Sequence, residues 1–220
     1  MLKNIQVVAF DVNGTLIGGN YHLWNKIFDE DLKLMKLEDA PPLKWYEAQT
    51  GKITFEEMVS LTYNVENPQK MKKEAYEVYM SELKLREGCI SLLENLRRRY
   101  KLIICSDTSG VTKVITKAFD LEKYFTKSFY STDVGYMKSD REFWNHILTS
   151  LQKRPEEIVM IGDNTRCDIH WPNLLGINTI QIPTTEKLPS RDLEVQNDDD
   201  KPDCQVKTLH EIQKILLKIE

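Results

Sequence analysis

The sequence has 220 residues, of which 41% are hydrophobic and 29% are charged, and its formal net charge is −4. This length suits one domain with an insertion, or a domain with a small cap, and it is ample for a buried core. The negative charge gives no reason to expect nucleic acid or an anionic membrane as a partner. No apolar run approaches the length of a membrane span.

Residues 1–4 run directly into the first apolar segment, so we expect no signal peptide. The four cysteines lie far apart and form no CxxC pair: Cys89, Cys105, Cys167 and Cys204. This spacing is typical of reduced thiols inside the cell, although an even count also permits a disulfide. We therefore expect a cytoplasmic protein. Nothing in the sequence indicates an oligomeric state.

The first apolar run, Ile5 with Val7–Phe10, predicts a strand that is buried on both faces. Asp11 follows this strand, and Gly14 and Thr15 then indicate a turn. Ligands of an open parallel sheet bind beyond the carboxyl ends of its strands. A carboxylate at this place can bind Mg²⁺, attack phosphorus, or do both, whereas the structural alternative is an Asp that only opens a turn.

Residues from about 21 to 85 predict a helical insertion without a strand pattern. The Gly18-Gly19 pair before it suggests a mobile or sharply turned exit. Apolar spacing predicts three helices, marked by Leu32, Met35 and Leu37, by Phe55, Met58, Val59 and Thr62, and by Tyr76, Tyr79, Met80 and Leu83. Thr54 and Glu57 form a capping-box pattern before the second helix.

Three aromatic residues of this insertion, Trp24, Trp45 and Tyr46, fit two interpretations. They can line a substrate pocket or form the core of the insertion, and the core is the more common use of such residues.

The chain after about residue 86 alternates between strands and amphipathic helices. Apolar runs predict strands at 102–105, 128–130, 158–161, 178–182 and 204–206, and helical spacing appears at 89–100, 111–118, 143–151, 174–176 and 209–219. Residues 184–203 are polar and predict a solvated loop. This alternation predicts a Rossmann-like α/β fold, with a parallel sheet that helices cover on both faces.

Polar residues follow one of these strands at Ser106 and Asp107. The Ser106 hydroxyl and the backbone amides after it suit the oxygens of a phosphate. The alternative is that Asp107, Thr108 or Ser109 caps the next helix.

A second polar group, Gly162-Asp163-Asn164, follows the strand at 158–161, and Asp168 lies five residues beyond Asp163. We expect Asp163 at the same rim as the carboxylate of the first strand. Two carboxylates at one rim favour a hard cation with oxygen ligands, and Mg²⁺ is the natural candidate. The structural alternatives are a turn residue and a helix cap.

A lysine, Lys138, lies in a loop before a helix that Ser139 or Asp140 can cap. At this place its charge can neutralise a phosphate and a nucleophilic carboxylate. An isolated loop lysine is otherwise a solvated charge.

Taken in order, Asp11, Ser106, Lys138 and Asp163 resemble the four motifs of the haloacid dehalogenase (HAD) superfamily. The first motif of that family is DxDGT, and here Asn13 replaces its second Asp. The other segments are similar to the motifs G-x-x-K-P-D, with Ser in place of Pro, and G-D-x-x-x-x-D. The resemblance covers nearly the whole chain, and it implies a core of residues 1–17 and 86–220 with a helical cap of residues 18–85.

The resemblance implies a Mg²⁺-dependent phosphatase that acts on a small phosphorylated metabolite. Asp11 would attack phosphorus and form an aspartyl-phosphate. Mg²⁺ would be held by Asp11, the backbone carbonyl of Asn13 and Asp163, with Asp168 or Asn164 in support. The phosphoryl oxygens would be bound by Thr15, Ser106, Asp107 and Lys138. The cap would exclude water and choose the leaving group.

Asn13 departs from the family's pattern, in which the second Asp is the general acid and base. An amide can neither donate nor take a proton near neutral pH, and a missing general acid costs about 10²–10⁴-fold in rate. Acyl and aryl phosphates would suffer less because their leaving groups need little protonation. A base from the cap, such as His22, is a further possibility.

Two other functions stay open. Some members of the superfamily that hydrolyse phosphonates also replace the second Asp, keep Mg²⁺ and use a cap lysine. This cap has many lysines, among them Lys26, Lys33, Lys36, Lys44 and Lys52. Metal-free dehalogenation is disfavoured by Asp163 and Asp168. A catalytically slow protein that binds a phosphorylated ligand or a protein partner would also retain such a site with Asn13.

Overall fold

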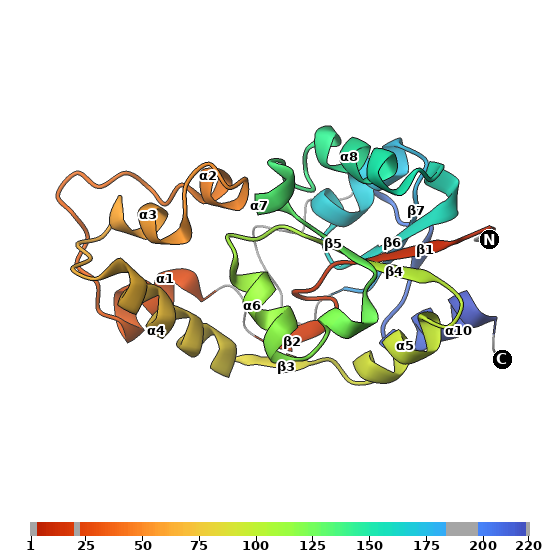
Figure 1. Ribbon diagram of the computed structural model, residues 1–220, viewed down its shortest axis with the longest axis horizontal. Helices are drawn as coiled ribbons and strands as arrows, with labels where there is room; N and C mark the ends of the chain where they lie inside the picture. The colour runs from red at the N-terminus through yellow and green to blue at the C-terminus, as the bar shows by residue number, and fades with distance from the viewer. Residues whose placement is uncertain (1–3, 20–22, 184–197, 219–220) are drawn as a thin grey trace.

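The computed structural model describes residues 4–19, 23–183 and 198–218. Its main sheet has six parallel strands in the order β5-β4-β1-β6-β7-β8. All of these strands except β8 are labelled in Figure 1. The strands are β1 Val7–Phe10, β4 Lys101–Ser106, β5 Lys127–Tyr130, β6 Ile158–Gly162, β7 Asn178–Gln181 and β8 Cys204–Gln205. The predicted α/β fold with a parallel sheet is confirmed.

Helices cover both faces of this sheet. They are α5 Cys89–Leu96, α6 Val111–Ala118, α7 Ser131–Val134, α8 Arg141–Leu151, α9 Trp171–Leu174 and α10 Leu209–Leu217. Successive residues of a strand point to opposite faces. Val8 and Phe10 therefore pack in the hydrophobic cluster of α5, α6 and α10, whereas Val7 and Ala9 pack in that of α8.

The order of the strands reverses beside β1. The chain passes from β1 to β4 and β5 on one side, and then to β6, β7 and β8 on the other. Ligands of such sheets bind in the crevice at this reversal, outside the carboxyl ends of the strands. Asp11 is the first residue after β1 and lies at this crevice. Its backbone N–H donates to the carbonyl of Ile161 over 2.9 Å.

Four helices of the insertion gather on one side of the molecule, away from the six-stranded sheet (Figure 1). They are α1 Trp24–Lys26, which continues into a π-helical turn at Ile27–Asp31, α2 Trp45–Gln49, α3 Phe55–Ser60 and α4 Pro68–Ser81. The capping box of α3 is confirmed. The Glu57 N–H donates to Thr54 Oγ1 over 3.1 Å, and the Thr54 N–H donates to Glu57 Oε2 over 2.7 Å.

The helix predicted around Leu32, Met35 and Leu37 is wrong, because the chain after Asp31 is irregular. Lys33 has a φ of 50°, in the left-handed region that a helix cannot continue through. Met35 is 70% exposed and Leu37 is 41% exposed, so their apolar side chains form no buried helical face.

A short antiparallel pair, β2 Ile17–Gly19 with β3 Leu83–Leu85, joins the insertion to the main sheet. The sequence predicted no strand within 21–85 and a helical Leu83, and both predictions are wrong. The glycine pair, predicted as a mobile or sharply turned exit, lies in β2, where Gly19 has a φ of 117°. Strands of three residues are too short to show an alternating pattern. We propose residues 18–85 as the cap, and the strand pair lies across both of its boundaries.

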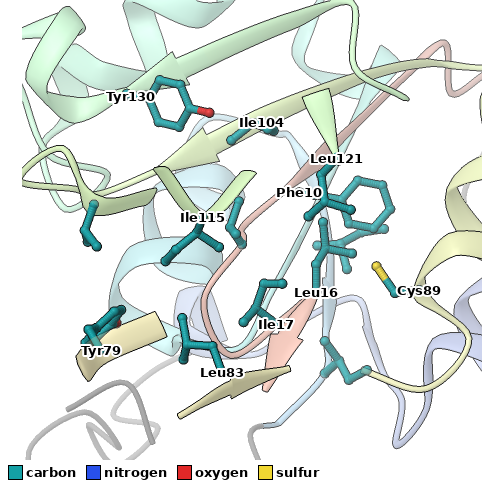
Figure 2. Close-up of a cluster of buried hydrophobic side chains, with 14 of the residues drawn as sticks. Phe10, Leu16, Ile17, Tyr79, Leu83, Cys89, Ile104, Ile115, Leu121 and Tyr130 are labelled. Carbon is teal, nitrogen blue, oxygen red and sulfur yellow. The ribbon is translucent and has the colours of Figure 1, made fainter. Parts of the chain in front are cut away.

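The hydrophobic core continues from the sheet into this strand pair. Figure 2 shows Phe10 of β1 and Leu16 close to Ile17 of β2, with Leu83 of β3 and Tyr79 of α4 beyond them. All five side chains are buried and belong to one cluster. The strand pair at the base of the insertion is therefore packed against the core. This packing holds the helices of the insertion beside the carboxyl end of the sheet.

Two further expectations concern parts that are described only partly. Asp198–Asp200 forms a single 3-10 turn, whereas residues 184–197 of the predicted polar loop lie outside the described residues. Within the described parts of the chain, no helix is long and apolar enough to cross a membrane.

Candidate active site

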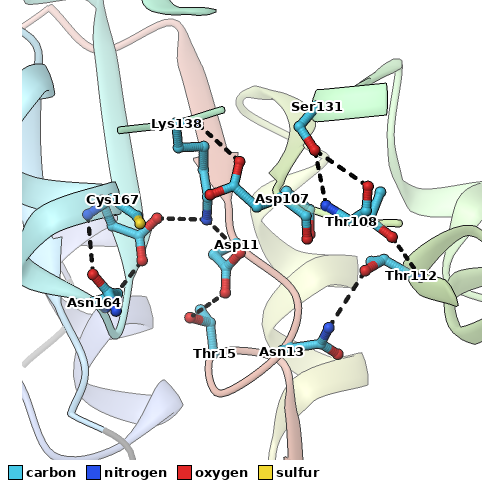
Figure 3. Close-up of polar contacts among 12 residues, drawn as sticks. Asp11, Asn13, Thr15, Asp107, Thr108, Thr112, Ser131, Lys138, Asn164 and Cys167 are labelled. Atoms are coloured by element: carbon cyan, nitrogen blue, oxygen red, sulfur yellow. Dashed lines mark hydrogen bonds and ion pairs between the residues drawn. The ribbon is translucent and has the colours of Figure 1, made fainter. Parts of the chain in front are cut away.

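Asp11 and Lys138 form a buried ion pair at the end of β1, as Figure 3 shows. Lys138 Nζ donates to Asp11 Oδ1 over 2.6 Å, and Thr15 Oγ1 lies 3.4 Å from Asp11 Oδ2. Asp11 is 5% exposed and Lys138 is 3% exposed. The structure thus brings together two residues that lie far apart in the sequence, and the lysine is not a solvated loop charge.

Three further contacts position Lys138. Its Nζ also donates to Asp168 Oδ1 over 2.7 Å, and its backbone N–H donates to Asp107 Oδ1 over 2.8 Å. Its carbonyl accepts a hydrogen bond from Trp144 Nε1 over 2.7 Å. The sequence analysis did not identify Trp144, since a tryptophan on an amphipathic helix predicts only core packing.

Burial works to lower the pKa of the Lys138 ammonium, but the adjacent carboxylates of Asp11 and Asp168 raise it well above its ordinary value. Lys138 is therefore a fixed positive charge and not a proton donor or acceptor near neutral pH. Such a charge can stabilise the negative charge that develops on a phosphoryl group.

Asp163 and Asp168 meet Asp11 at the reversal of the strand order. One carboxylate oxygen from each of the three lies within 4.8 Å of the others, and all three residues are buried. Gly162 makes this approach possible, because a Cβ there would lie 2.2 Å from Asp168 Cγ. Asp168 Oδ2 also accepts a hydrogen bond from the Asn164 N–H over 3.0 Å.

The chemistry of this donor set fits a hard divalent cation. Three carboxylates face one ammonium, so negative charge is in excess. Burial raises the pKa of the Asp168 carboxyl to about 7 although Lys138 works to lower it, and Asp11 and Asp163 raise it further. Oxygen ligands with excess negative charge are what Mg²⁺ requires. The side-chain oxygen of Asn164 instead accepts a hydrogen bond from the Cys167 N–H over 3.0 Å.

Asn13 lines the same site but carries no titratable group. Its Nδ2 donates to Thr112 Oγ1 over 3.3 Å. Its Oδ1 is buried and has no hydrogen-bond partner among the described residues. The position suits a group that contacts a ligand, although the amide cannot transfer a proton.

Ser106 ends β4 beside these residues and is 1% exposed. Its hydroxyl donates to the Asp107 carbonyl over 3.3 Å. The N-cap residue of α6 is Gly110, which has no side chain to cap the helix. Thr108, two residues earlier, accepts hydrogen bonds from the Gly110 N–H over 2.9 Å and the Thr112 N–H over 3.0 Å. The predicted phosphate contacts of Ser106 and Asp107 stay a prediction.

A cleft of about 430 Å³ lies between these core residues and the insertion. From the core it is lined by Asp11, Asn13, Ser106, Asp107, Thr108, Ser109, Val111, Thr112, Lys138, Asp163, Asn164, Cys167 and Asp168, and from the insertion by Trp24, Asn25, Trp45, Gln49 and Tyr79. Trp24 and Trp45 thus line the cleft and also pack against other aromatic rings. His22 lies outside the described residues.

The insertion also contacts the core at a second place, where α2 lies beside α7 (Figure 1). Tyr46 is not part of the cleft lining, and its hydroxyl donates to Asp140 Oδ2 over 3.2 Å. Gly51 lies so near the Thr132 carbonyl that a Cβ would be 2.6 Å from its oxygen. The insertion therefore contacts the core both at the strand pair and at α7.

The fold and the site together define a Rossmann-like α/β protein with a buried carboxylate and lysine at the carboxyl end of the first strand. The chain belongs to the haloacid dehalogenase-like hydrolases, because the model of that family matches residues 5–170. A second model, of HAD-hydrolase-like proteins, matches residues 136–212.

Individual relatives agree with this assignment. The HAD-hydrolase YfnB of Bacillus subtilis is 25% identical over 199 residues, which cover 81% of this chain and 84% of YfnB. Its structure bound to magnesium has a TM-score of 0.65 at 20% identity and covers 99% of this chain and 100% of that one.

Two other solved structures have the same fold. A HAD phosphatase from Thermococcus onnurineus has a TM-score of 0.68 at 20% identity, covering 96% of this chain and 98% of that one. The HAD family enzyme bt-2542 of Bacteroides thetaiotaomicron, in complex with magnesium and inorganic phosphate, has a TM-score of 0.64 at 20% identity, covering 84% and 98%.

Proposed function

We propose that this hydrolase is a Mg²⁺-dependent phosphatase of a small phosphorylated molecule, with Asp11 as the nucleophile. The observation that carries this proposal is the buried constellation at the strand reversal, in which Lys138 Nζ lies 2.6 Å from Asp11 Oδ1 and three carboxylates converge. The magnesium and phosphate bound to bt-2542, a protein of the same fold, support the choice of ligands.

The chain's own residues account for the first step. An Asp11 oxygen forms a bond to phosphorus while the bond from phosphorus to the leaving oxygen breaks, which yields an aspartyl-phosphate. Lys138 is held by Asp107 and Trp144, so its ammonium can remain beside the phosphoryl oxygens without reorganising. Water then attacks phosphorus, releases phosphate and restores the Asp11 carboxylate.

Mg²⁺ would be held by Asp11, Asp163 and the backbone carbonyl of Asn13, with Asp168 in support. When bound, it neutralises phosphate charge and orients the phosphoryl group. The insertion would act as a cap that excludes water from the cleft and selects the leaving group.

Asn13 supports a second candidate, a protein that binds a phosphorylated ligand with little turnover. This proposal requires that the site keep its affinity for phosphate and metal while lacking the proton donor. The phosphatase is preferred because Asp11 and Lys138, which act on the phosphoryl group itself, are both present.

Phosphate release from acetyl phosphate, with Mg²⁺ or with EDTA, tests the proposal. We expect turnover with Mg²⁺ that EDTA abolishes, and no turnover by Asp11→Asn. Acetyl phosphate is chosen because its leaving group needs little protonation and so tolerates Asn13. An exposed carboxylate outside the cleft, Glu77→Gln, serves as the matched control and should retain full activity.

Absence of turnover in the unmodified protein, together with binding of inorganic phosphate that depends on Mg²⁺, would replace the phosphatase by the binding protein. Turnover that survives Asp11→Asn would exclude Asp11 as the nucleophile. Release of phosphate from phosphonoacetaldehyde but not from acetyl phosphate would support phosphonate hydrolysis instead.

A further inference from the structure

The two sides of the cleft differ in chemistry. Every charged residue of the lining comes from the core: Asp11, Asp107, Lys138, Asp163 and Asp168. The insertion contributes three aromatic rings and two neutral amides: Trp24, Tyr79, Trp45, Asn25 and Gln49. A leaving group on this side of the cleft therefore meets aromatic faces and amides but no described charged side chain.

The aromatic rings on this side of the cleft pack against one another. The Trp24 ring stacks on Tyr79 of α4, with 4.5 Å between centroids and 7° between planes. It also packs against Phe55 at 5.1 Å and Phe28 at 5.8 Å. The ring of Trp45 in α2 lies beside that of Trp24, with 6.0 Å between their centroids. Trp24 and Trp45 are only partly buried and both line the cleft, so a flat ring can bind against them without ordering a mobile side chain.

Asn13 restricts the leaving group independently. Its amide has no proton to transfer, and its Nδ2 already donates to Thr112. Asn13 therefore favours a leaving oxygen that can depart as an anion. A phenolate-type oxygen, with a pKa near that of tyrosine at about 10, departs far more readily than an alkoxide, whose pKa is close to that of water at about 15.7.

We infer that the substrate is an aryl phosphate, a phosphate ester of a phenol-type hydroxyl on an uncharged planar ring; this inference rests on the phosphatase proposed above. The ring lies against Trp24 and Trp45 while the phosphoryl group lies at Asp11. The bond from Asp11 to phosphorus forms as the bond from phosphorus to the aryl oxygen breaks. The electron pair stays on that oxygen, which takes its proton from water.

The test compares benzoyl phosphate with acetyl phosphate. Both have carboxylate leaving groups of similar basicity, and only the first carries a ring. We expect the unmodified protein with Mg²⁺ to give a kcat/KM for benzoyl phosphate that is about tenfold higher or more, because the ring gains contacts in the cleft. Phenyl phosphate should likewise exceed butyl phosphate.

Trp24, Trp45 and Tyr79 form an aromatic wall on this side of the cleft. Substituting one of these residues tests whether the wall causes the preference for a substrate with a ring. Trp45→Leu should lower the ratio of kcat/KM for benzoyl phosphate to that for acetyl phosphate about tenfold. Trp45→Phe keeps an aromatic face and should restore most of the loss. Trp45 is the better choice than Trp24, whose stack on Tyr79 contributes to the fold of the insertion.

Equal kcat/KM for benzoyl and acetyl phosphate would overturn the aryl substrate while leaving the phosphatase intact. An equal loss with both substrates in Trp45→Leu would also overturn it. Because the comparison of substrates uses the unmodified protein, it decides the question even if a variant does not fold. Failure to release phosphate from either substrate would contradict the phosphatase itself, and this inference with it.

Discussion

At the residue scale, the amide of Asn13 decides which proton transfers the proposed phosphatase can make. Asn13 lies in the loop after β1, close enough to Thr112 for a hydrogen bond of 3.3 Å, and its Oδ1 faces no described donor. Asp11, Lys138 and the acidic cluster lie in the same cleft. The amide of Asn13 should slow only those reactions in which the leaving oxygen needs a proton.

Asn13→Asp should raise turnover of butyl phosphate by about 10²–10⁴-fold, the usual contribution of a general acid, and change turnover of acetyl phosphate far less. The measurement is the slope of log kcat/KM against the pKa of the leaving group, which should become shallower in the variant. Asn13→Ser, which adds no acid, is the control. Equal gains for both substrates would show that the new carboxylate does not act as an acid.

At the scale of secondary structure, the pair of β2 and β3 determines how the insertion is attached. Arg86 reinforces it, since its guanidinium donates to the Gly14 carbonyl over 2.8 Å and its backbone N–H to the Leu16 carbonyl over 2.9 Å. These bonds connect the end of β3 with the loop that carries Asn13. The entry of the insertion and the catalytic loop are therefore one packed unit.

Gly19→Ala should lower the free energy of unfolding by about 1–3 kcal/mol, the cost of a strained backbone conformation. Gly19 has a φ of 117°, and a Cβ there would lie 2.1 Å from the Glu82 carbonyl oxygen. Urea denaturation measures the change. Gly18→Ala is the matched control, because its Cβ would meet only Arg86 Cγ at 3.5 Å, and it should shift stability by less than about 0.5 kcal/mol. Equal losses in both variants would contradict this reading of the strand pair.

At the scale of the whole molecule, the acidic cluster couples folding to protonation. Burial raises the pKa of Asp168 to about 7, whereas an unfolded Asp titrates at about 3.9. The folded state without metal thus holds this proton more tightly than the unfolded state does. Its contribution to stability is present below about pH 4 and is lost as the pH rises through about 7.

Mg²⁺ competes with that proton, so its stabilising effect should increase with pH. We expect the rise in Tm on adding Mg²⁺ to be larger at about pH 8 than at about pH 6, since a ligand that binds only the folded state stabilises it. Asp163→Asn should remove most of the rise at both pH values. A rise in Tm that is independent of pH, or unchanged in Asp163→Asn, would contradict this coupling.

The sequence determined the parallel α/β core, because long apolar strands and amphipathic helices are visible in local patterns. It also determined which residues lie at the strand ends, since Asp11 and Ser106 follow an apolar run directly and Asp163 follows one after a single glycine. The capping box of α3 was predictable for the same reason: its signal lies within four consecutive residues.

Only the tertiary structure decided what depends on contacts between distant segments. The pairing of β2 with β3 joins strands of three residues each, which are too short to show a period. The contact of Lys138 with Asp11 spans 127 residues, and the hydrogen bond from Trp144 to Lys138 depends on how α8 packs on the sheet. The aromatic wall arises likewise, because Trp24, Trp45 and Tyr79 come from three helices whose packing no local pattern encodes.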